Sequence, residues 1–120
     1  MVADTPESAV DELAGRAEPG DIAKVDRQFA EKLARLEESE VASSEMLDRL
    51  RVMWAMLKTD SDGVTWRDKA LIMAALSYFV SPVDAIPDIA GKLGYMDDAR
   101  VVAIVWDRIE AARKAFSASE

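Results

Sequence analysis

The feature that most constrains the fold is an uncharged stretch, residues 70–83, with Pro82 close to its end and Pro87 shortly after it. Its first part, ALIMAALSYFV at 70–80, is apolar on every side of a helix, a pattern typical of a helix buried all round or lying in lipid. A bilayer crossing needs about 20 residues, and Asp84 and Asp88 prevent the stretch from being extended. The pattern therefore predicts a central buried helix from Trp66 to about Val80.

Three other stretches have the three- and four-residue spacing of amphipathic helices. The first follows Asp21 and carries charged side chains, Lys32 among them, on its outer faces. The apolar positions of the three stretches are Ile22, Val25, Phe29, Leu33 and Leu36; Met46, Leu47, Leu50, Met53, Trp54 and Leu57; and Val101, Val102, Val105, Trp106, Ile109, Ala112 and Phe116. No stretch has the alternation of a strand. The prediction is an all-α fold, a small bundle of four main helices with an optional short N-terminal helix.

The first 20 residues are acidic and contain few large apolar side chains. Thr5 and Pro6 suit a helix start, whereas Gly15 and the Pro19–Gly20 pair suit its end. We expect residues 1–20 to form a flexible acidic segment and residues 21–117 to form a single helical domain.

The segment before the central helix resembles part of a calcium-binding loop, with Asp60, Asp62 and Gly63. Such a loop needs carboxylates at its first and twelfth positions, where this chain has Lys58 and Lys69. A turn at 60–63 is the better interpretation. Thr65 and Asp68 have the spacing of a capping box at the start of the central helix.

Composition narrows the range of functions. The chain has no cysteine and no histidine, so thiolate and imidazole chemistry are excluded. It has 23 acidic and 15 basic residues, a net charge of −8, which argues against nucleic acid and against electrostatic docking to anionic lipid. The residues after Met1 lack the pattern of a signal peptide, so we expect a cytoplasmic protein.

Four aspartates in the Pro/Gly-containing corner after the central helix are the candidate site, because clustered carboxylates suit a hard cation such as Mg²⁺ or Ca²⁺. They are Asp84, Asp88, Asp97 and Asp98. A carboxylate pair for acid–base chemistry is a second interpretation. The third is structural, because aspartate caps helices and forms turns, and we favour it since capping requires only a neighbouring amide. The predicted structural corner comprises Pro82, Asp84, Pro87, Asp88, Gly94, Asp97 and Asp98.

The same residues resemble the YkvA-like family, a bacterial helical domain of unknown function. The matching elements are Tyr78, Ser81-Pro82-x-Asp84-x-Ile86-Pro87-Asp88, and Leu93-Gly94-Tyr95-x-Asp97-Asp98, within a family-like core at about 64–105. Ala85 replaces the bulky aliphatic residue usual in the family, and Gly91 replaces a proline. The resemblance implies a helical fold and membrane association, but no reaction, cofactor or substrate.

These patterns favour a non-catalytic interaction or scaffold module without a required cofactor. The expected partner is another protein or a second copy, bound through Phe29, Leu33 and Leu36 or through Met46, Met53 and Trp54. One alternative is an enzyme or sensor that depends on a divalent cation at the aspartate corner. Another is a protein at the periphery of the membrane, which only the family resemblance suggests.

Overall fold

The computed structural model describes residues 6–39, 44–59, 63–80 and 98–119. Its elements are α1 (Pro6–Arg16), the 3₁₀ turn η1 (Pro19–Asp21), α2 (Ile22–Ser39), α3 (Ser44–Leu57), α4 (Trp66–Val80), α7 (Asp98–Arg108) and α8 (Glu110–Ser119). No strand occurs within these ranges, so the all-α prediction is confirmed.

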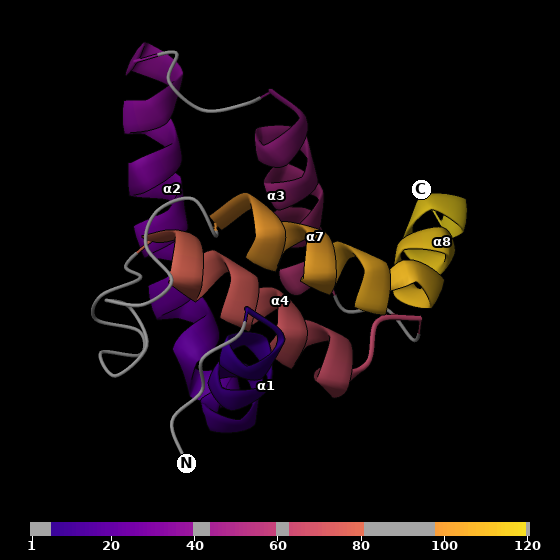
Figure 1. Cartoon of the computed structure of the whole chain (residues 1–120). Helices are drawn as coiled ribbons and strands as arrows, with labels where there is room; N and C mark the ends of the chain where they lie inside the picture. Colours follow the sequence, from indigo (N-terminus) through magenta and orange to yellow (C-terminus); the bar gives the residue numbers. More distant parts are fainter. Residues whose placement is uncertain (1–5, 40–43, 60–62, 81–97, 120) are drawn as a thin grey trace.

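Helix α4 is the centre of the bundle, and α1, α2, α3 and α7 all contact it (Figure 1). Its predicted bounds are confirmed, and Leu71, Ile72, Leu76 and Phe79 are 0–5% exposed. A helix without a polar face can be accommodated in water only when neighbours cover it on all sides. The surrounding helices provide that cover.

The start of α4 is fixed by the predicted capping box. The Thr65 backbone N–H donates to Asp68 Oδ2 at 3.0 Å, and the Asp68 N–H donates to Thr65 Oγ1 at 3.3 Å. Two amides at the helix start thus obtain acceptors that the helix itself does not supply. Gly63, just before, lies in a turn, while residues 60–62 are outside the described ranges.

The prediction of four main helices with an optional N-terminal one differs from the structure in the division of the last helix. In the described ranges there are six α-helices, since the optional N-terminal helix is present and the C-terminal helix is divided at Ile109. Helix α1 packs on α4 with Val10 fully buried, although so few large apolar residues occur in this stretch. The flexibility of residues 1–20 and the domain boundary at residue 21 stay predictions.

The prediction of a single continuous C-terminal helix is wrong. The helix is interrupted at Ile109, where α8 turns away from the direction of α7 (Figure 1). The Arg113 side chain reaches back across this turn, and its Nε donates to the Trp106 carbonyl oxygen at 3.0 Å. Its guanidinium also lies 4.2 Å from the centre of the Trp106 ring. Basic side chains commonly satisfy the last carbonyls of a helix in this way. The bend keeps Ala112 and Phe116 against the core.

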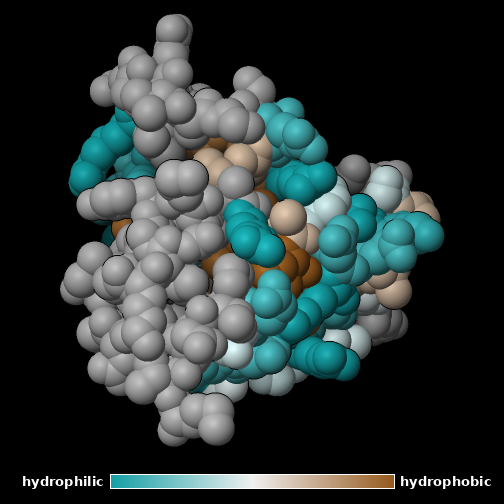
Figure 2. All heavy atoms as spheres, viewed as in Figure 1, coloured by the Kyte–Doolittle hydropathy of each residue, from teal (hydrophilic) through white to brown (hydrophobic). Residues whose placement is uncertain are grey.

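Hydrophilic side chains cover most of the described surface on the face shown in Figure 2, with hydrophobic atoms visible near its centre. Among the described residues, Val52 and Trp66 are the large hydrophobic side chains that stay exposed, at 36% and 42%. The remaining apolar faces are used in packing the helices together.

Candidate functional site

Most of the predicted corner lies outside the described residues. This applies to Pro82, Asp84, Pro87, Asp88, Gly94 and Asp97. Tyr78 is buried in α4, and Asp98 is the first residue of α7. The capping, acid–base and cation-binding interpretations of the four aspartates therefore stay predictions.

The structure does place the two helix ends that the corner joins. Helices α4 and α7 are in contact, and the end of α4 lies on the same side of the bundle as the start of α7 (Figure 1). The contacts around the last turn of α4 therefore determine where the chain enters the corner.

Lys32 of α2 binds the end of α4 in two ways. Its Nζ donates a hydrogen bond to the Phe79 carbonyl oxygen at 2.5 Å and lies 4.8 Å from the centre of the Phe79 ring. Phe79 is the penultimate residue of α4, so its carbonyl is among the last four that have no donor within the helix. The ammonium group supplies that donor and places a positive charge at the negative end of the helix dipole.

Three aromatic rings lead from this contact into the bundle. Phe29 lies between the other two, with its ring centre 5.9 Å from that of Phe79 and 5.2 Å from that of Trp54. The pair with Trp54 is edge-to-face, the arrangement that aromatic quadrupoles favour. We call Trp54, Phe29 and Phe79 the aromatic cluster. It connects α3, α2 and α4.

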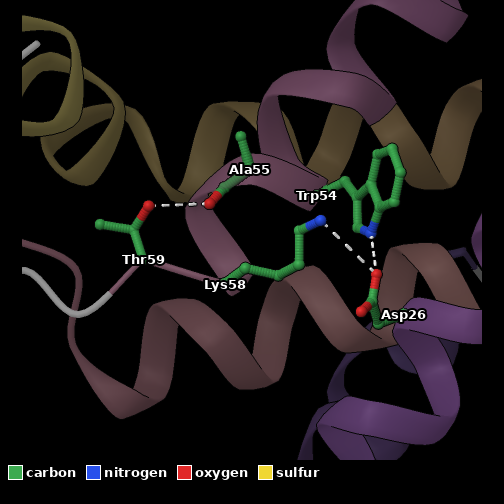
Figure 3. Close-up of polar contacts among 5 residues, drawn as sticks. All are labelled: Asp26, Trp54, Ala55, Lys58 and Thr59. Carbon is green, nitrogen blue, oxygen red and sulfur yellow. Dashed lines mark hydrogen bonds and ion pairs between the residues drawn. The ribbon is translucent and has the colours of Figure 1, made fainter.

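The Trp54 end of the aromatic cluster has its own polar contacts (Figure 3). The indole Nε1–H of Trp54 donates to Asp26 Oδ1 at 2.5 Å, and Lys58 Nζ lies 3.7 Å from the same oxygen. Lys58 Nζ also lies 4.0 Å from the centre of the Trp54 ring. Both ends of the aromatic cluster thus carry a lysine against a ring, a favourable cation–π arrangement.

The chemistry of these groups is that of holding helices together. None of the buried side chains that the structure describes is charged, and Lys32, Asp26 and Lys58 each bind a group on another helix. Within the described ranges, no three acidic, cysteine or histidine side chains gather as a metal site would require.

Comparison with known proteins bears on the segment that begins with α4. Residues 68–104 match the family model described as a protein of unknown function, DUF1232. A curated relative from Bacillus subtilis (strain 168), named an uncharacterized membrane protein YkvA, is 45% identical over 40 residues. The chain carries a YkvA-like segment, residues 68–104.

The YkvA-like segment is a minor part of both proteins. The aligned residues cover 33% of this chain and 38% of the Bacillus subtilis protein. No solved structure matches the chain. Helices α1, α2 and α3 lie before the matched segment, so Lys32, Phe29 and Trp54 contact it from outside.

The sequence did not identify Lys32 and Asp26 as contact residues. The charge pattern places Lys32 on an outer face, whereas it is half-buried and reaches α4, because its four-carbon side chain can cross to the neighbouring helix end. The one indication in the sequence that Lys32 lies near another helix is its position beside the apolar stripe, next to Leu33. That position does not predict which helix end is within reach.

The stripes expected to bind a partner are used within the chain itself. Phe29, Leu33 and Met53 are buried, and Met46 and Trp54 are half-buried against the same core. The side chain of Leu36 lies outside the described part. The binding of a partner through these faces therefore stays a prediction, while the described residues pack against the chain's own core.

Proposed function

We propose that the chain is a non-catalytic helical scaffold that holds its YkvA-like segment in position to bind another protein. The observation that carries this proposal is the position of α4, which is surrounded by α1, α2, α3 and α7. The first three of these helices lie outside the YkvA-like segment, so they serve to bury and fix the helix that begins it.

The polar side chains support the same role. Asp11 binds Arg108 between α1 and α7, Asp26 binds Trp54 between α2 and α3, and Lys32 binds Phe79 between α2 and α4. Each contact joins two different helices, through residues that are 97, 28 and 47 positions apart in the sequence. The charged side chains in these contacts thus help to fix the helices relative to one another.

The proposal can be tested with a photo-reactive amino acid in the full chain, in the cells that naturally make it. Position 85 lies in the YkvA-like segment, and Ala34, exposed on α2, is the matched control. We expect a discrete protein adduct from position 85 and none from position 34. Adducts of equal yield from both positions, or none from either, would contradict the proposal.

A second candidate is a role at the periphery of a membrane, which the printed name of the Bacillus subtilis relative favours. Among the described helices, none combines the length and the apolar character that a membrane crossing requires.

Flotation of the purified chain with lipid vesicles tests direct association. With a net charge of −8, the chain should gain nothing from added anionic lipid, since polybasic segments are what such lipid attracts. Flotation with zwitterionic vesicles would support the membrane role. A chain that stays at the bottom of the gradient with both lipids would refute direct association.

A further inference from the structure

Three residues of α2 form one row along the helix that spans from α3 to the end of α4. Asp26, Phe29 and Lys32 follow each other at three-residue steps, so they are neighbours on the helix surface. Asp26 binds Trp54, Phe29 packs between Trp54 and Phe79, and Lys32 binds the Phe79 carbonyl. One helix face thus carries an uninterrupted series of contacts between two other helices.

We propose that Lys32 is a positioning residue that fastens the last turn of α4 to α2, a contact we call the latch. We further propose that the aromatic cluster transmits to Trp54 whether Lys32 is bound to Phe79 or released from it. This inference goes beyond the proposed function, because it holds whatever the YkvA-like segment binds. It concerns the last described turn of α4, residues 77–80.

The latch has two arrangements because the Lys32 side chain can bind Phe79 or extend into water. When bound, its ammonium satisfies a carbonyl that the helix leaves unpaired and interacts with the helix dipole. When Lys32 is released, that carbonyl loses this donor, and the last turn loses a contact that opposes fraying. Local opening of helix ends is a low-energy event, so a single contact is sufficient to change it.

Trp54 is well placed to respond. Asp26 binds the Trp54 indole, so the indole stays in place when the packing between Phe29 and Phe79 changes. If the last turn of α4 opens, the Phe79 ring withdraws from Phe29, and Phe29 gains freedom against Trp54. Packed side chains with discrete arrangements are the physical means by which such coupling travels.

The test uses the full ¹⁵N-labelled chain and two readouts, amide hydrogen exchange at residues 77–80 and the indole N–H signals of the three tryptophans, assigned by Trp→Phe variants. Lys32→Met keeps the apolar stem and removes the ammonium. We expect exchange at 77–80 to accelerate about tenfold, the lower end for a hydrogen bond to a charged group. The Trp54 indole signal should move, and those of Trp66 and Trp106 should not.

Three variants separate the latch from a general loss of stability. Lys24→Met removes an exposed lysine from the same helix and should change neither readout. Lys32→Arg keeps a donor that stacks on aromatic rings and should preserve both readouts. In a Phe29→Leu background, Lys32→Met should still accelerate exchange but leave the Trp54 signal unmoved.

An unchanged exchange rate at 77–80, a uniform acceleration across all helices, or an unmoved Trp54 signal in Lys32→Met would each overturn the proposal. If Lys32→Met does not fold, Lys32→Gln removes the same charge and is judged by the same criteria.

Discussion

Asp11 and Arg108 are 97 positions apart in the sequence, and Arg108 Nη1 lies 2.6 Å from Asp11 Oδ1. The pair joins α1 to α7, so the acidic N-terminal helix is tied to the last part of the chain beyond the YkvA-like segment. Beside it on α1, Val10 is fully buried in the common core. Helix α1 therefore has both a polar and an apolar attachment to the bundle.

The apolar attachment should contribute more to stability than the ion pair. We expect Val10→Ala to lower the free energy of unfolding by about 1.5–3 kcal/mol, the range for a buried apolar side chain. Asp11→Asn should cost less than about 1 kcal/mol, because the pair is open to solvent. Urea denaturation measures both. A Val10→Ala effect below about 0.5 kcal/mol would instead support the predicted flexible segment at 1–20.

The central helix offers a direct test of core packing. Leu76 is fully buried in α4, so Leu76→Ala should lower the free energy of unfolding by about 2–5 kcal/mol through lost burial and an added cavity. Val52→Ala, at an exposed position of α3, is the control and should change stability by about 0.5 kcal/mol or less. Equal effects of the two variants would show that α4 is not the centre of the core.

The capping box at the start of α4 should have a measurable effect on stability. Asp68→Ala removes the acceptor of the Thr65 N–H, and we expect a loss of about 1 kcal/mol, typical for a lost cap. Asp68→Asn keeps an acceptor and should cost less. Thermal unfolding of both variants, with exposed Asp48→Ala as the control, distinguishes capping from a general effect of charge.

The aspartates of the corner can be assigned by comparing two kinds of substitution. If Asp84, Asp88, Asp97 and Asp98 cap helices and turns, single changes to Asn should be mild and changes to Ala should cost about 1 kcal/mol each. If they bind a cation, Asn should be as harmful as Ala, and Mg²⁺ or Ca²⁺ should raise the melting temperature in a saturable way. We expect no saturable increase. An increase that the Asn variants abolish would establish a cation site.

The bounds of α4 and the burial of its side chains were predictable because the 70–80 stretch has no polar face, which favours a position in the interior of a helical bundle. The Thr65–Asp68 contact was equally predictable, since both partners lie within one helical turn. Such local relationships are fixed by sequence spacing alone.

The missed contacts depend on the arrangement of helices in three dimensions. Lys32 and Phe79 are 47 positions apart, and Trp54 and Asp26 are 28 apart, so no periodicity connects them. The docking of α1 and the bend at Ile109 likewise follow from which core surfaces are available after the other helices have packed.

The burial of α4 has a practical consequence for anyone who wishes to transplant the stretch that this chain shares with its relatives. Residues 68–104, cut out and fused to another protein, would leave behind α1, α2 and α3 and expose the apolar surfaces those helices cover. Such surfaces promote aggregation. A useful chimera would exchange the corner residues within this framework and keep the enclosing helices intact.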